Sequence, residues 1–102
     1  MTQLVDLASL IRSKNAGPFW LTIDIFCDTP SVFETVRTNL HLKDVAALFK
    51  VNETTLQRFD IESLNVIKIS LPRPVVQGSR LDRDMHGAQW AMLMGTLTLT
   101  TP

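Results

Sequence analysis

The sequence predicts an α+β domain in which helices pack on one face of a mostly antiparallel sheet. Segments with the 3.6-residue period of a helix stand between segments that alternate every second residue, and a long connection precedes the last alternating segment. At 102 residues, the chain is expected to form a single domain over residues 1–102 with one modest core.

The N-terminal segment, residues 2–14, has the spacing of a helix. Leu4, Leu7, Ala8 and Ile11 share one helical face, and a Gly-Pro pair that follows is a stop signal. An extended segment from Leu4 to Ile11 is the alternative, because Leu7 and Ile11 also share one strand face. The helix is the favoured interpretation.

Residues 19–27 alternate and predict a strand. One face is apolar, whereas the other carries Trp20, Thr22, Asp24 and Phe26, so we expect it to be covered only in part, by another segment or another chain. Cys27 ends this strand as the single cysteine, and a buried, inert thiol is expected there.

Further along the chain, Thr29 and Pro30 have the signature of a helix start, with the helix ending near residue 39. We expect a second helix over 42–50, a turn or brief helical start over 52–55, and a strand with Ile67, Ile69 and Leu71 on one face. Residues 75–89 are polar and aperiodic, and Met92–Thr100 alternates as a final strand. A ferredoxin-like arrangement fits this order best.

Charge and motifs exclude several function classes. Ten basic and ten acidic side chains cancel, so no global field recruits nucleic acid or an anionic membrane. The two histidines lack partners at metal-ligand spacing, the four glycines stand apart, and no phosphate loop or nucleophile elbow is present, so we expect no metal and no cofactor. No apolar run is long enough for a membrane span and no signal-peptide pattern is visible, which favours the cytoplasm.

Two polar clusters are the candidate binding sites, and no catalytic residue can be assigned. The candidates for binding a substrate or anion are Arg12, Ser13, Lys14, Asn15, Arg73, Ser79, Asp82, Asp84, His86 and Gln89. The cations of the first cluster suit carboxylate or phosphate, but they equally suit a solvated helix C-terminus. The second cluster suits an oxygen-rich ligand, or it is an ordinary hydrophilic loop.

Large apolar side chains form a third candidate. Trp20, Phe26, Trp90, Met92 and Met94 either make a protein interface or complete the domain's own core.

Several motifs carry a resemblance to a known family. They are the segment from Arg12 to Pro18, the strand Leu21–Ile25, the Pro72-Arg73-Pro74 turn, and the polar stretch from Gly78 through Asp82 and Asp84 to Gln89. Together they resemble, over almost the whole chain, a family of small bacterial proteins known as a domain of unknown function. That family resembles the C-terminal ferredoxin-fold domain of acyclic terpene utilisation protein A, where a basic Arg-Ser-Gly-Asp-Lys-Gly motif replaces residues 12–17. One departure is Trp90-Ala91-Met92, where further polar residues including a histidine are expected, so the ligand here is expected to be different or more apolar.

The resemblance implies a small accessory subunit, typically encoded beside a larger terpene-utilisation-type subunit with which it forms a hetero-oligomer. The complex would be a hydratase or other lyase acting on a carboxylate or acyl-CoA metabolite, with the two polar clusters binding that anionic ligand or the partner. The alternatives are a stand-alone homo-oligomeric isomerase or lyase and a non-catalytic module that binds a ligand or partner.

Overall fold

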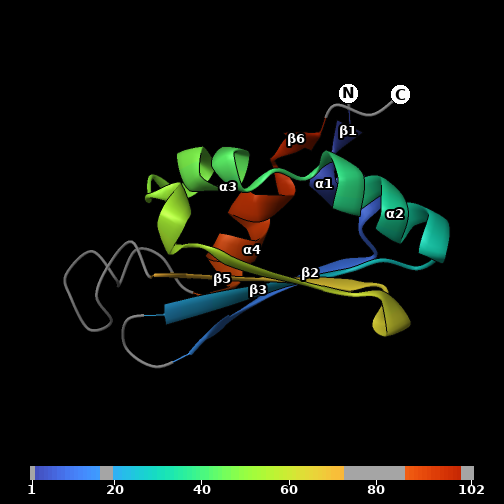
Figure 1. Ribbon diagram of the computed structural model, residues 1–102, viewed down its shortest axis with the longest axis horizontal. Helices are drawn as coiled ribbons and strands as arrows, with labels where there is room; N and C mark the ends of the chain where they lie inside the picture. The colour runs from blue at the N-terminus through green and yellow to red at the C-terminus, as the bar shows by residue number, and fades with distance from the viewer. Residues whose placement is uncertain (1, 17–19, 73–86, 100–102) are drawn as a thin grey trace.

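The computed structural model describes residues 2–16, 20–72 and 87–99, and these form two layers (Figure 1). A four-stranded antiparallel sheet is built from β2 (Leu10–Asn15), β3 (Trp20–Phe26), β4 (Gln57–Ile61) and β5 (Val66–Pro72) in the order β2-β3-β5-β4. The helices α1 (Leu4–Leu7), α2 (Pro30–Asn39), α3 (Leu42–Phe49) and α4 (Gly87–Gly95) lie on one side of that sheet. The predicted α+β class, with helices on one sheet face, is confirmed.

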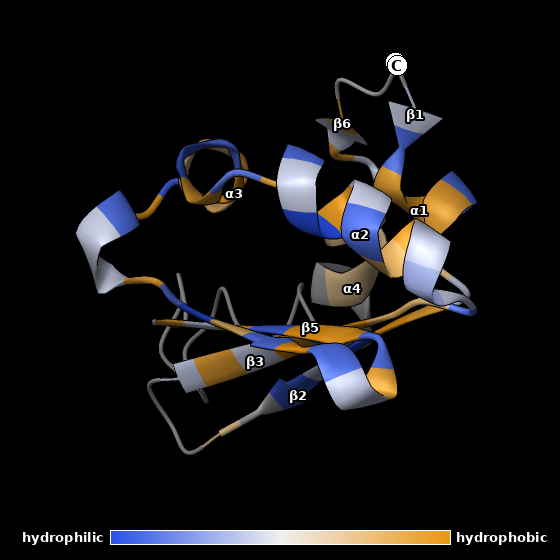
Figure 2. Cartoon of the chain, turned by 45° about the vertical axis from the view of Figure 1, so that its right-hand side comes forward, coloured by the Kyte–Doolittle hydropathy of each residue, from blue (hydrophilic) through white to orange (hydrophobic). Residues whose placement is uncertain are grey.

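The core lies between the sheet and the helices, and Figure 2 shows that β3 and β5 contain many hydrophobic residues. Leu21, Ile23 and Ile25 of β3 are fully buried, as are Ile67 and Ile69 of β5. Each such side chain contributes roughly 1.5–3 kcal/mol by leaving water. Helix side chains that complete the core are Phe33, Val36, Val45, Phe49 and Met94.

The middle of the chain forms as predicted. The Thr29 side chain accepts a hydrogen bond from the amide of Val32 at 3.2 Å and caps α2, whose first residue is Pro30. A 3₁₀ turn, η1 (Glu53–Thr55), occupies the expected short helical start, and Asn52 caps it.

The prediction of a helix over residues 2–14 is wrong outside Leu4–Leu7, and Thr2–Gln3 are extended. Only α1, one turn long, is helical, and from Leu10 onward the chain is strand β2, paired with β3. Ser9 fixes the start of that strand, because its amide and hydroxyl both donate to the carbonyl of Phe26, at 2.8 and 2.9 Å. Pairing with a strong neighbouring strand outweighs the local helical spacing.

The prediction of a strand over Met92–Thr100 is also wrong. Residues 87–95 form α4, and only β6 (Thr98–Leu99) is extended, paired with β1 (Thr2–Gln3). Alanine, methionine and leucine favour helix, and a short apolar run cannot be assigned by periodicity alone. The helix buries Met94 completely, whereas the alternating pattern places it on the threonine face.

The ferredoxin-like arrangement is not confirmed. Two antiparallel hairpins, β2–β3 and β4–β5, flank the helices α2 and α3 in the sequence, and β5 joins them by pairing with β3. Strand β4 is an element that the sequence prediction does not separate from β5. A second 3₁₀ turn, η2 (Glu62–Leu64), and Asn65, with φ of 54°, turn the chain between them.

Candidate functional site

The first polar cluster lies on strand β2, and the strand divides it between the two faces of the sheet. In the register, Ser13 stands opposite the buried Ile23, so it points to the helix side. Arg12 and Lys14 stand opposite Asp24 and Thr22 on the other side. Because successive strand residues face opposite ways, Ser13 lies on the other face of the sheet from Arg12 and Lys14.

That second side of the sheet, which we call the open face, has no described helix against it (Figures 1 and 2). One cross-strand row on it runs Arg12, Asp24, Lys68, Phe59 over the four strands. Three large apolar side chains of the open face are exposed: Leu10, Trp20 and Phe59, at 51%, 40% and 50%. This exposure agrees with the prediction that the face of β3 carrying Trp20 is covered only in part.

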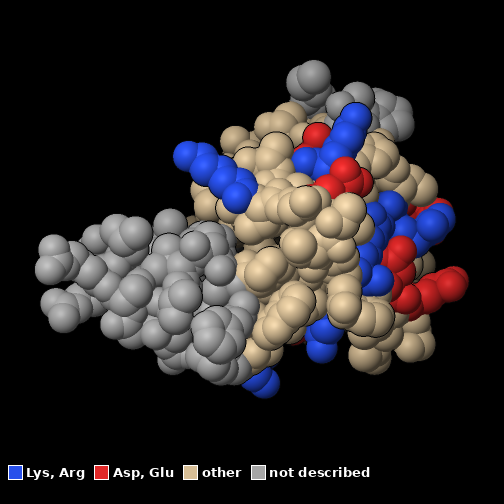
Figure 3. Space-filling model, turned by 60° about the vertical axis from the view of Figure 1, so that its left-hand side comes forward, with Lys and Arg blue, Asp and Glu red and all other residues tan. Residues whose placement is uncertain are grey.

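Asp24 sits between two cations of the row. Its Oδ1 is 4.0 Å from the Nζ of Lys68, and this oxygen is buried without a hydrogen bond. Within the described chain no ion pair of Arg12 or Lys14 is found. In the view of Figure 3, some described basic side chains lie beside acidic ones and others stand apart, and no extended field of one sign is seen.

A pocket of about 430 Å³ runs along β2 where the strand meets α1 and α4. Its lining is mostly apolar and consists of Val5, Ala8, Ser9, Leu10, Ile11, Arg12, Ser13, Ala91 and Met92. Val5 and Met92 are 55% and 73% exposed at its rim. The Ser13 Oγ is buried and has no hydrogen-bond partner, which costs roughly 1–3 kcal/mol for a buried polar group. The pocket therefore has mostly apolar walls, and the Ser13 hydroxyl beneath its lining is buried rather than accessible.

A second hollow, of about 330 Å³, lies between α3 and β4 and includes His41, Lys43, Glu53 and Arg58. The guanidinium of Arg58 is already engaged by Asp60 at 2.8 Å and by two backbone carbonyls. Arg58 therefore links β4 to the end of α2, and most of its guanidinium N–H groups are not free to bind a ligand.

The third candidate set divides between core and surface. Met94 belongs to the core, as one interpretation predicts, whereas Trp20 and Met92 are exposed, and for them the interface interpretation stays a prediction. Cys27 is buried as expected. Burial, with a smaller contribution from the charge of Asp28, raises the pKa of its thiol, which opposes a nucleophilic role.

The second polar cluster is not placed against the first. Gln89 lies in α4 and Asn15 ends β2, with only their backbone positions described. The other members, Arg73, Ser79, Asp82, Asp84 and His86, lie outside the described residues. Over residues 2–16, 20–72 and 87–99, no three His, Cys, Asp or Glu side chains gather as a metal site would require. No helix in this part of the chain is long and apolar enough to cross a membrane.

Sequence reasoning missed several residues of the open face and pocket. Leu10, Phe59 and Lys68 lie on three different strands, and only the pairing register places them on the face of the sheet that carries Arg12. Val5 joins the pocket lining from α1. Period-two alternation around Phe59 was the one available signal.

Fold and site together define a small α+β domain with an open sheet face and an apolar pocket along its edge strand. The chain belongs to the family described as "Domain of unknown function (DUF4387)", whose model matches residues 4–97. No curated protein and no solved structure shows a significant match to the chain.

Proposed function

We propose that this chain is the small accessory subunit of a heteromeric enzyme and docks on a larger subunit of the terpene-utilisation type. The observation that carries the proposal is the open face, where Leu10, Trp20 and Phe59 expose apolar surface on an otherwise ordered sheet. Aromatic residues that are buried at the centre of an interface supply much of its binding energy.

Arg12 and Lys14 would lie at the boundary of the two subunits. An arginine fork and a lysine charge are suited to a carboxylate, or to the phosphates of an acyl-CoA, which agrees with the ligand class that the terpene-utilisation resemblance implies. A hydratase or other lyase that acts on such a metabolite is the corresponding reaction class. Its catalytic groups would come mainly from the larger subunit.

Co-expression of this chain with a tagged copy of the larger subunit encoded beside it tests the proposal. We expect a stoichiometric complex that survives size-exclusion chromatography with wild-type protein. Phe59→Glu, on the open face, is expected to abolish copurification. Lys43→Glu, an exposed change in α3 on the helix side, is the matched control and is expected to leave the complex intact. A monodisperse chain without affinity for its neighbour contradicts the proposal.

A further inference from the structure

Strand β2 is an edge of the four-stranded sheet and, within the described chain, pairs only with β3. The amide of Ala16 donates to the carbonyl of Trp20 at 3.0 Å, which fixes the hydrogen-bonding phase of this hairpin. Backbone groups alternate in direction along an antiparallel strand, so those of Arg12 and Lys14 point towards β3. The N–H and C=O groups of Ile11 and Ser13 therefore point outward from the sheet edge. Unpaired groups of this kind form a template for another strand.

The apolar pocket lies along the same edge. Its lining includes the exposed Val5 of α1 and Met92 of α4, together with Ile11 and Ser13 of β2. A strand added to β2 would place every second side chain on the helix side, in this pocket, and the intervening side chains on the open face. The pocket thus provides side-chain selectivity where the edge provides backbone hydrogen bonds.

Charge decides between the candidate occupants of the edge. On the open face, the added strand would lie beside Arg12 and Lys14. A second copy of β2 would bring the same two cations against them, and like charges on neighbouring strands are destabilising. Acidic residues at these positions would instead pair with both cations.

We propose that β2 accepts, as an added strand, an extended segment of a protein partner in which apolar residues alternate with acidic ones. The inference rests on the proposed function in taking the larger subunit as the source of that segment. The apolar residues enter the pocket between α1 and α4, and the acidic residues face Arg12 and Lys14.

A synthetic peptide of about eight residues, alternating valine and glutamate and capped at both ends, is the first probe, since natural strands have similar lengths. In NMR titration of the wild-type chain, we expect its binding to shift and protect the amides of Ile11 and Ser13. A lysine–valine peptide is expected to bind at least about tenfold more weakly. N-methylation of the alternate peptide residues whose N–H groups face β2 should abolish binding. N-methylation of the residues in between, whose N–H groups face away from β2, should preserve it. Equal binding of the lysine peptide, or no dependence on the methylation phase, overturns the inference.

Variants of the protein then separate this inference from the proposed function. Ser13→Pro removes one outward N–H on an edge strand, where proline is tolerated, and should weaken peptide binding at least about tenfold. The paired change Arg12→Glu and Lys14→Glu should reverse the preference for the acidic peptide, whereas Lys43→Glu should not.

If the larger subunit copurifies with Ser13→Pro as well as with wild type, but is lost with Phe59→Glu, the inference fails and the proposed function stands. If the wild-type chain forms no complex with the larger subunit, the proposed function fails. The peptide titration then decides by itself whether β2 accepts an added strand. Self-association that Ser13→Pro removes would assign the edge to a second copy and overturn the inference.

Discussion

Asp24 lies directly opposite Lys68 in adjacent strands of the open face, with its Oδ1 4.0 Å from the Lys68 Nζ. On its other side the same residue stands opposite Arg12. The carboxylate therefore separates two cations that would otherwise be neighbours in one cross-strand row. Because its Oδ1 makes no hydrogen bond, we expect the effect of Asp24 on stability to come from its charge beside Lys68 and Arg12.

Reversing the charge at this position should destabilise the sheet. Asp24→Lys would create a row of three cations, and we expect the free energy of unfolding in urea to fall by about 1 kcal/mol. Asp24→Asn removes the charge and keeps the shape, so its free energy of unfolding should lie between those of Asp24→Lys and wild type. The difference between the two variants should shrink at high salt, because salt screens partly exposed charges. A difference that salt does not change would contradict this explanation.

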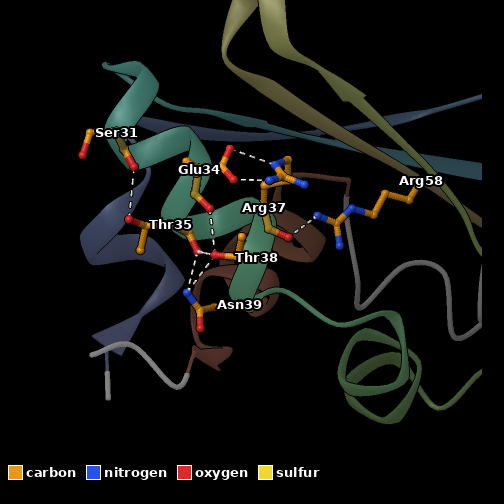
Figure 4. A network of polar contacts seen from close by, with 7 residues as sticks. All are labelled: Ser31, Glu34, Thr35, Arg37, Thr38, Asn39 and Arg58. Atoms are coloured by element: carbon orange, nitrogen blue, oxygen red, sulfur yellow. Dashed lines mark hydrogen bonds and ion pairs between the residues drawn. The ribbon is translucent and has the colours of Figure 1, made fainter.

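Arg58 joins β4 to the end of α2 (Figure 4). Its guanidinium donates to the carbonyls of Arg37 at 2.7 Å and Leu40 at 2.5 Å, which are among the last carbonyls of that helix and its cap. Arg58→Ala leaves these carbonyls unpaired, so we expect a loss of about 2 kcal/mol in urea unfolding. Arg58→Lys should recover only part, because lysine lacks the planar fork. Arg37→Ala removes the exposed pair with Glu34 and is the control, for which little change is expected. Equal effects of the two alanine variants would contradict this role.

Local signals were sufficient where the chain makes its structure from neighbouring residues. Strand β3 alternates strictly, and Thr29 with Pro30 starts α2 through a cap and a fixed φ. Strand β2 and helix α4 depend on distant partners. Leu10–Asn15 is extended because β3 pairs with it, and the run Ala91–Met94 is helical because that form packs Met94 against the core.

The candidate site shows the same limit. The residue types of Arg12 and Lys14 suggest a segment that binds anions, which stays a prediction, but their assignment to a helix end placed Ser13 with them, whereas the segment is strand β2. Only the strand register shows that Ser13 lies on the pocket side. The exposed residues Leu10 and Phe59 lie on the two opposite edge strands, β2 and β4. No spacing in the sequence reveals that they share one face of the sheet.

Gly95 controls how closely α4 approaches α1 beside the pocket. A Cβ added there would lie 3.1 Å from the Cβ of Val5 and 3.6 Å from the Cδ1 of Ile11. Gly95→Ala should cost less than a larger residue, because a shift of the one-turn helix α1 by a few tenths of an ångström relieves the contact with the Cβ of Val5. Gly95→Leu should force the two helices apart and lower the free energy of unfolding by roughly 1–3 kcal/mol. Equal urea midpoints for the two variants would show that α1 does not pack tightly here.

Cys27 should be a slow-reacting thiol in the folded protein. Burial, and to a smaller degree Asp28, raise its pKa above the ordinary value of 9.0, so the reactive thiolate is rarer than in the unfolded chain. Labelling with a thiol-reactive disulfide reagent at neutral pH should be slow in buffer and fast in urea. Asp28→Asn should speed labelling modestly, because it removes the charge contribution.

The same shift in the Cys27 pKa predicts a pH dependence of stability. The folded state holds the thiol proton more tightly than the unfolded state. The resulting stabilisation is therefore complete below the unfolded pKa of about 9 and is lost as the pH rises through the raised folded pKa. Urea unfolding measured from neutral pH to above pH 9 should show a steeper loss for wild type than for Cys27→Ala, which lacks the proton. Parallel curves for the two proteins would show that the thiol ionises alike in both states, contrary to its burial.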